Sequence, residues 1–225
     1  MLSNYTAIVL ARNGSKRLAK KNKLCINNIP LYLHAVNQGM RTCGNVILNT
    51  DIPSAELDLP KNVYLYERPT ILGGDTITSS EVIMDMLNTL NLSEQTLVLL
   101  QPTSPLRQDS DIYAAIDLYQ KNIYELVVSV STVDNSCLKY GILEQGRFIP
   151  LACPEYCFAN TQQLPEVYKP NGAVYIFNSK SFLINNGFPS SDIGTITMPD
   201  SHSIDIDCYD DFILASQSFI NSNND

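Results

Sequence analysis

The sequence lacks features that are typical of membrane proteins, secreted proteins and zinc or redox proteins. Its 225 residues include no tryptophan and two histidines, and no stretch reaches the roughly 20 apolar residues that cross a bilayer. The apolar run near the start is short and has no basic region before it, so no signal peptide is expected. Six cysteines are scattered along the chain without C-x-x-C spacing, which argues against a zinc or redox site. We therefore expect a cytoplasmic protein with reduced thiols and no membrane partner.

Each end of the chain lacks charge of one sign. No acid precedes Asp51, and no lysine or arginine follows Lys180. The net charge is -8, and an acidic chain is a poor match for the phosphate backbone of a nucleic acid. Within this acidic chain, one short segment gathers six cations: Arg12, Lys16, Arg17, Lys20, Lys21 and Lys23. Such a basic cluster indicates a small polyanion as the ligand.

Hydrophobic patterning alternates between strand-like and helix-like segments, which predicts an α/β fold with a largely parallel sheet. Strands are expected over 5–10, 45–51, 62–67, 96–101, 125–133, 171–177 and 194–199, and helices over 29–40, 78–90, 109–121 and 209–220. We expect one domain over residues 1–225.

The alternation breaks at about residue 134. Residues 138–150 predict a hairpin about Gln145-Gly146, and the following stretch to residue 170 reads as irregular because it contains three prolines. We interpret 134–170 as an excursion from the core and as the candidate contact with a second subunit.

The basic segment directly follows the first expected strand. Asn13-Gly14-Ser15 predicts a flexible turn whose backbone amides can approach phosphates, while the surrounding cations neutralise their charge. The spacing of glycine and lysine fits neither a Walker A loop nor the G-x-G-x-x-G pattern. A solvated basic loop is the alternative reading.

A second motif, SIDIDCYDD, covers residues 203–211. In an extended segment Asp205 and Asp207 would lie on one side, opposite Ile204 and Ile206. Two such carboxylates can hold one hard divalent cation whose shell is completed by water and phosphate oxygens. An edge strand with outward polar residues is the alternative. A phosphate loop together with a cation site predicts phosphoryl or nucleotidyl transfer.

Five segments in order carry a family resemblance: ARNGSKRLAKKN, ERPTILGGDTITSS, LLQPTSPLR, QQLPEVYKPNGAVYI and SIDIDCYDDF. They resemble the signature blocks of the acylneuraminate cytidylyltransferases, the CMP-sialic acid synthetases. The resemblance implies a Rossmann-like nucleotidyltransferase fold, a homodimer and a Mg²⁺ requirement, with Mn²⁺ as the alternative. It also implies a reaction of CTP with a nine-carbon sugar acid that yields the CMP-sugar and pyrophosphate.

The same resemblance assigns roles to individual positions. Arg12 and Lys21 would contact the triphosphate, with Lys16 nearby, and Asp205 and Asp207 would bind the metal. The anomeric hydroxyl would attack the α-phosphorus, assisted by the metal at Asp207, and no side chain stands out as a dedicated base. The remaining nucleotide positions are Asn22, Arg68, Ser79 and Gln101, and the sugar positions are Gln101, Lys139, Lys169 and Tyr175, with Phe188 as an apolar wall for an N-acyl methyl group or as part of the core.

One departure from the family pattern leaves the sugar open. Thr161 stands where the family usually has an arginine before the QQLP run, and Lys169 replaces a second usual arginine, so that it keeps the charge but loses the planar fork. Sialic acid is the first expectation; a legionaminate-type, pseudaminate-type or 3-deoxy-octulosonate substrate is the alternative. A non-catalytic nucleotide-binding relative is opposed by the retention of four residues: Arg12, Lys21, Asp205 and Asp207.

Overall fold

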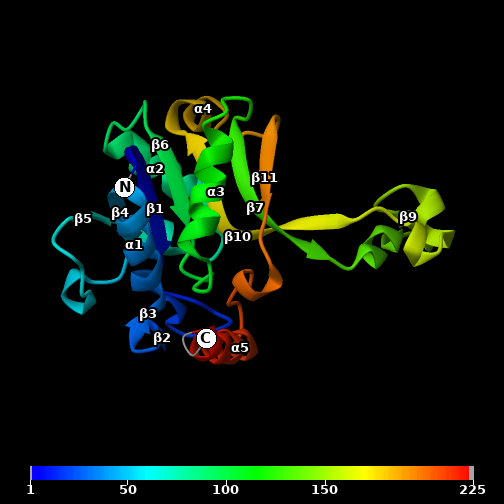
Figure 1. Ribbon diagram of the computed structural model, residues 1–225, viewed down its shortest axis with the longest axis horizontal. Helices are drawn as coiled ribbons and strands as arrows, with labels where there is room; N and C mark the ends of the chain where they lie inside the picture. Colours follow the sequence, from blue (N-terminus) through cyan, green and yellow to red (C-terminus); the bar gives the residue numbers. More distant parts are fainter. Residues whose placement is uncertain (1, 223–225) are drawn as a thin grey trace.

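A computed structural model describes residues 2–222, so residue 1 and residues 223–225 of the predicted single domain lie outside the described part. Its centre is a seven-stranded sheet with the order β11-β7-β10-β6-β1-β4-β5 (Figure 1). The strands are β1 (Leu2–Ala11), β4 (Cys43–Thr50), β5 (Val63–Glu67), β6 (Thr96–Leu100), β7 (Leu126–Val133), β10 (Val167–Asn178) and β11 (Ile193–Thr197). Only β10 runs antiparallel to its neighbours within this sheet, so the predicted, mostly parallel α/β fold is confirmed.

Helices cover both faces of the sheet, and the alternation of side chains along β1 shows why. Ala7 and Val9 face one way and Ile8 the other, and all three are fully buried. The first face packs against α1 (Leu31–Thr42) and α3 (Asp109–Tyr119), and the second against α2 (Ser79–Thr89) and α4 (Ser179–Ile184). Because both faces of the sheet are covered, polar side chains can gather at the ends of the strands.

The strand order creates a crevice at the carboxyl end of β1. From β1 the chain fills one side of the sheet with β4 and β5, and β6 then pairs with β1 on its other side. The connections after β1 and β6 therefore leave in opposite directions, which in open α/β sheets is where ligands bind. Arg12 follows the end of β1, and Gln101 follows the end of β6.

The last helix, α5 (Tyr209–Ser222), closes this end of the molecule below the sheet, beside the small hairpin of β2 (Cys25–Ile26) and β3 (Ile29–Pro30) (Figure 1). A separate apolar cluster joins them: Ile26, Leu31, Leu106, Ile206 and Ala215 are all buried. This cluster brings the end of the chain against the segment that follows β1.

The predicted excursion projects from the sheet between β7 and β10 (Figure 1). Val133 of β7 pairs directly with Val167 of β10, so the chain leaves and re-enters the sheet at adjacent positions. The predicted hairpin is present as β8 (Gly141–Glu144) and β9 (Arg147–Pro150). Gln145 and Gly146 have φ of 49° and 77°, as a two-residue hairpin turn requires.

Two expectations from the sequence need correction. The irregular reading up to residue 170 is wrong at its end, because β10 begins at Val167 and pairs with β7. The edge-strand alternative for SIDIDCYDD is also wrong: residues 203–207 belong to no strand. Over residues 2–222, no helix is both long and apolar enough to cross a bilayer.

Candidate active site

A cavity of about 350 Å³ opens at the carboxyl ends of β1 and β6. We call it the basic cavity because Arg12, Arg17, Lys21 and Arg68 all line it. Its wall also contains three other residues that the sequence assigned to the nucleotide: Asn22, Ser79 and Gln101. Lys16 does not line the cavity, and its side chain is 79% exposed.

The loop after β1 is held in place by two hydrogen bonds. The Asn13 amide donates to Asp51 Oδ1 at 2.6 Å, and Asn22 Nδ2 donates to the Arg12 carbonyl at 2.8 Å. A Cβ added at Gly73 would come within 2.7 Å of Asp51 Oδ2, so the absence of a side chain there lets the loop after β5 approach. Asn22 and Asp51 therefore shape the loop after β1.

Arg68 and Ser79 come from neighbouring elements. Arg68 Nε donates to Asn49 Oδ1 at 2.8 Å, which fixes the guanidinium at the end of β4. Burial lowers the pKa of Arg68, and the positive charge of Arg12 adds to this effect while Asp51 opposes it. Ser79 is the first residue of α2, whose capping box pairs Thr78 with Glu81.

Asp75 is an acid among the cations of the basic cavity. Its two carboxylate oxygens lie 2.7 Å from Arg12 Nη1 and 3.0 Å from Lys16 Nζ, and hydrogen bonds from these two cations, Lys16 first, lower the pKa of the Asp75 carboxyl. Asp75 thus forms ion pairs with Arg12 and Lys16, two of the cations that the family resemblance assigns to a triphosphate.

The sequence resemblance assigns CTP to this cavity, and on that assignment we expect Asp75→Asn to bind CTP several-fold more tightly than the unchanged protein. Removing the carboxylate frees two cations for the phosphates, and because exposed ion pairs are weak, the gain should stay within roughly fivefold. Isothermal titration at two salt concentrations measures the effect, which should shrink at high salt. Glu94→Gln makes the same charge change at an exposed residue outside the cavity. Weaker CTP binding by Asp75→Asn would show instead that Asp75 orients Arg12.

A second cavity, of about 580 Å³, adjoins the first. We call it the acidic cavity because Asp205, Asp207 and Asp211 line it. Gln101 lines both cavities, so one side chain at the end of β6 faces both spaces.

Ile206 anchors the two aspartates that flank it. Its side chain is fully buried, its amide donates to the Thr103 carbonyl at 2.8 Å, and its carbonyl accepts from Lys21 Nζ at 2.7 Å. Asp211 accepts from the Asp207 and Cys208 amides at 2.9 and 2.8 Å, the role of a first-turn acid. The segment is therefore held by loop contacts rather than by a sheet.

The basic loop and the aspartates meet at Asp207. Its Oδ1 lies 3.0 Å from Arg17 Nη2 and 3.2 Å from Lys21 Nζ, and the Lys21 side chain is 14% exposed. Asp205 is an exposed residue of the acidic cavity. Partial desolvation by the surrounding protein raises the pKa of its carboxyl, with the nearby charge of Asp207 acting in the same direction.

The donor set at these aspartates fits a hard divalent cation. Carboxylate oxygens are the ligands that Mg²⁺ and Mn²⁺ prefer, and one or two of them are enough when phosphate oxygens and water complete the shell. No group of three or more His, Cys, Asp or Glu side chains within residues 2–222 could hold an ion alone. The residues therefore fit a metal that is shared with a phosphate ligand.

Of the residues that the sequence assigned to the sugar, some line the acidic cavity and others lie outside it. Lys169 and Tyr175 line it together with Gln101. The Phe188 ring lies 5.3 Å from that of Tyr175 and packs edge-to-face on Phe177 and Phe182, so it supports Tyr175 from the core. Lys139 lies in a short 3-10 helix of the excursion and lines neither cavity.

Sequence reasoning missed several residues of the two cavities. Arg17 was placed in the basic cluster without a role, although it pairs with Asp207. Asp75 and Thr103 lie within two of the segments that carry the family resemblance, ERPTILGGDTITSS and LLQPTSPLR. Position within those stretches was a usable signal for Asp75 and Thr103; the contact of Arg17 depends on the folding of an irregular loop.

Comparison with known proteins shows the family of this chain. Residues 6–143 match the family model described as Cytidylyltransferase. This match spans more than half of the chain, which therefore belongs to the cytidylyltransferase family. 

Relatives and solved structures extend over nearly the whole chain. An N-acylneuraminate cytidylyltransferase of Streptococcus agalactiae serotype V is 32% identical over 92% of this chain and 51% of the relative, so the chain spans about half that protein's length. A CMP-N,N'-diacetyllegionaminic acid synthase of Legionella pneumophila is 30% identical over 94% of each chain. The solved CMP:2-keto-3-deoxy-manno-octonic acid synthetase complexed with CTP superimposes with a TM-score of 0.71 at 14% identity, over 98% of this chain and 100% of that one, which shows a shared fold.

Proposed function

We propose that this protein transfers a cytidylyl group from CTP to a nine-carbon sugar acid of the sialic acid class and releases pyrophosphate. The observation that carries the proposal is the junction of the two cavities. Cations line the first, aspartates line the second, and Gln101 faces both. Two relatives, the N-acylneuraminate cytidylyltransferase and the CMP-N,N'-diacetyllegionaminic acid synthase, support the same reaction class.

The chain's own residues would bind and orient both reactants. Arg12, Lys21 and Arg68 line the space for the nucleotide, where their positive charge would stabilise the triphosphate and the departing pyrophosphate. The anomeric hydroxyl oxygen would bond to the α-phosphorus as the bond to the pyrophosphate oxygen breaks, and the hydroxyl proton would pass to solvent water. Gln101 and Tyr175 would hold the sugar in the acidic cavity so that its hydroxyl faces the nucleotide.

Asp205 and Asp207 would hold the divalent metal that cytidylyltransferases of this kind generally use. When bound, Mg²⁺ would neutralise charge on the phosphate oxygens. Lys21, which contacts Asp207, would keep that carboxylate oriented toward the phosphates. Chelation with EDTA should stop pyrophosphate release, and added Mg²⁺ or Mn²⁺ should restore it; turnover that persists in EDTA would contradict the metal assignment.

A panel of sugar acids tests the proposed function. Sialic, legionaminic, pseudaminic and 3-deoxy-octulosonic acids would each be incubated with CTP and Mg²⁺, followed by pyrophosphate detection and mass spectrometry of the CMP adduct. We expect the largest turnover with sialic acid, and preference for another acid would correct the substrate. Binding of CTP without pyrophosphate release from any acid would overturn the activity.

We also propose a homodimer formed through residues 134–170. Large apolar side chains stay exposed along this excursion in the single chain: Leu143 at 77%, Leu151 at 68% and Phe158 at 92%. Apolar surface of this extent is typical of a protein–protein contact. Lys139 lies on the same excursion, outside both cavities of its own chain, so a role for it at a sugar site would require a second copy.

Charged residues on the excursion should yield monomers. We expect Leu143→Lys combined with Phe158→Asp to halve the mass measured by size-exclusion chromatography with light scattering, because the charges oppose burial of this surface. Ile184→Asp alters an equally exposed apolar residue at the end of α4, at 71% exposure, and should leave the mass unchanged. A double variant with the mass of the unchanged protein would place the contact elsewhere.

A further inference from the structure

A buried arginine lies behind the junction of the two cavities. Arg107, in the turn before α3, is 1% exposed. Burial lowers its pKa to about 9, so the guanidinium keeps its charge at neutral pH. A buried charge normally has an opposite charge as partner. Within residues 2–222, the hydrogen bonds that this guanidinium donates go to neutral oxygens: the backbone carbonyls of Gln101 and Ala173 and the side-chain oxygen of Gln38.

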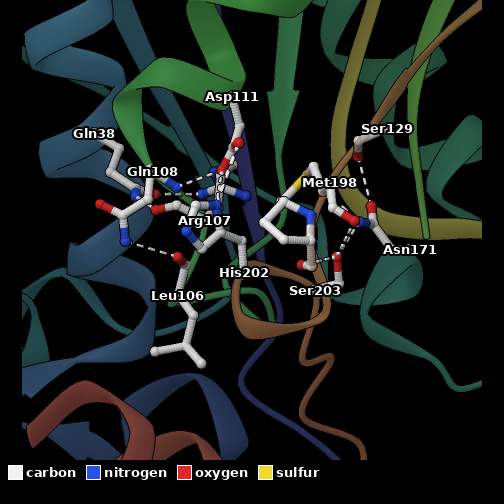
Figure 2. A network of polar contacts seen from close by, with 11 residues as sticks. Gln38, Leu106, Arg107, Gln108, Asp111, Ser129, Asn171, Met198, His202 and Ser203 are labelled. Atoms are coloured by element: carbon white, nitrogen blue, oxygen red, sulfur yellow. Dashed lines mark hydrogen bonds and ion pairs between the residues drawn. The ribbon is translucent and has the colours of Figure 1, made fainter. Parts of the chain in front are cut away.

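The two acids that follow Arg107 in the sequence are engaged elsewhere. Asp109 forms a two-point pair with Arg41, at 2.6 and 2.9 Å. Asp111 accepts from the Gln108 amide at 2.8 Å and lies 3.0 Å from His202 Nδ1. Figure 2 draws Arg107 among Gln38, Gln108, Asp111 and His202. Both acids raise the pKa of Arg107 from a distance, but within residues 2–222 their close contacts are with other groups, so the hydrogen bonds of Arg107 define its position.

The hydrogen bonds of Arg107 join two strands where their ladder ends. The last β6–β10 pair is Leu100 with Val174. Beyond it, Arg107 Nη1 donates to the Ala173 carbonyl at 2.6 Å and to the Gln101 carbonyl at 3.3 Å. Nη2 donates to Gln38 Oε1 at 2.6 Å. The planar guanidinium thus bridges the point at which β6 and β10 separate.

This bridge lies beside an irregular part of β10 near the side chain of Gln101. The register of β10 against β7 shifts between Pro170 and Tyr175, and we call residues 171–173 the bulge of β10. Gly172 has φ of 79°, and a Cβ added there would lie 3.7 Å from Gln101 Oε1. The opposite side of the bulge is fixed by Asn171, which accepts from Ser129 Oγ at 2.6 Å and donates to Ser203 Oγ at 3.0 Å (Figure 2). The bulge is therefore held from two sides, and it lies against the residue that both cavities share.

We infer that Arg107 is a positioning residue: its fork fixes Gln101 and the β10 bulge at 171–173 in the arrangement that sets nucleotide and sugar side by side. The inference rests on the proposed function. A lysine in this place would keep the charge but could not donate in one plane to Ala173, Gln101 and Gln38. Misplacement of a positioning group by about 1 Å can lower turnover roughly 100-fold.

A double-mutant cycle tests this role. We expect Arg107→Lys to lower kcat about 10- to 100-fold, and to lower it less than about threefold when Gln101 is already alanine, because its effect passes through Gln101. Arg41→Lys, an exposed arginine one turn along α1 from Gln38, is the matched control and should leave kcat unchanged. An equal loss in both backgrounds, or none in either, would overturn the inference.

A second readout needs no turnover. The side-chain amide resonance of Gln101, assigned through Gln101→Ala, should shift in Arg107→Lys and stay in place in Arg41→Lys. If Arg107→Lys does not fold, Gln38→Leu removes one acceptor of the fork and should shift the same resonance. An unmoved resonance would overturn the positioning role even if the protein is active, whereas absence of pyrophosphate release from the unchanged protein would count against the proposed reaction alone.

Discussion

Asp207→Ala is expected to lower kcat by at least about 100-fold while the protein stays folded. The carboxylate is one of the two proposed metal ligands, and loss of a charge-stabilising group at a phosphoryl-transfer site has an effect of this size. Folding should survive because the Asp207 side chain is 42% exposed and contacts the side chains of Arg17 and Lys21. The backbone contact with Asp211 does not involve the removed atoms. Steady-state pyrophosphate release at saturating CTP and Mg²⁺, with a thermal melt, measures both quantities.

The control for this change lies three residues away. Asp210→Ala removes the same charge from an exposed acid in the first turn of α5 that lines neither cavity. It should leave kcat within about twofold of the unchanged protein. Normal turnover of Asp207→Ala with Mg²⁺ present would refute the metal assignment, and equal losses in both variants would indicate a general effect of charge.

Lys21→Met should have the second largest effect, a loss of about 100-fold in kcat/KM for CTP. Lys21 is the lysine that lines the basic cavity and also contacts the aspartate segment, through Ile206 O at 2.7 Å and Asp207 Oδ1 at 3.2 Å. Methionine keeps much of the bulk and removes the charge. Initial rates over a range of CTP concentrations measure the change.

The neighbouring lysine provides the comparison. Lys20 is exposed and has φ of 53°, and it lines neither cavity. Lys20→Met makes the same charge change one residue away and should alter kcat/KM less than about threefold. A comparable loss in both variants would show that the loop acts through its net charge rather than through the contact of Lys21 with the aspartates.

Local sequence patterns predicted those helices and strands whose formation depends mainly on their own residues. The apolar run of β1 and the capping residues of α2 fix those elements within a few positions. The start of β10 was not predictable in this way. Val167 to Pro170 contain a proline and little alternation, and they form a strand because β7, more than 30 residues earlier, supplies the ladder.

The candidate site shows the same division between local and distant causes. Position after β1 and β6 placed Arg12 and Gln101 correctly at one edge of the sheet. The conformation around Asp205 depends on Thr103 and Lys21, which are distant in sequence, so alternation alone suggested a strand that is absent from residues 203–207. Arg107 was hidden for a related reason: its acceptors are carbonyl oxygens, which no side-chain pattern reveals.

The direct pairing of Val133 with Val167 makes the segment between them a detachable module. Antiparallel partners at the end of a ladder can be joined by a two-residue turn such as Asn-Gly. Excising residues 134–166 and closing the gap in this way would shorten the chain without breaking any pair of the seven-stranded sheet. The seven-stranded core and most of the segment that we propose as the homodimer contact can thus be separated by one deletion.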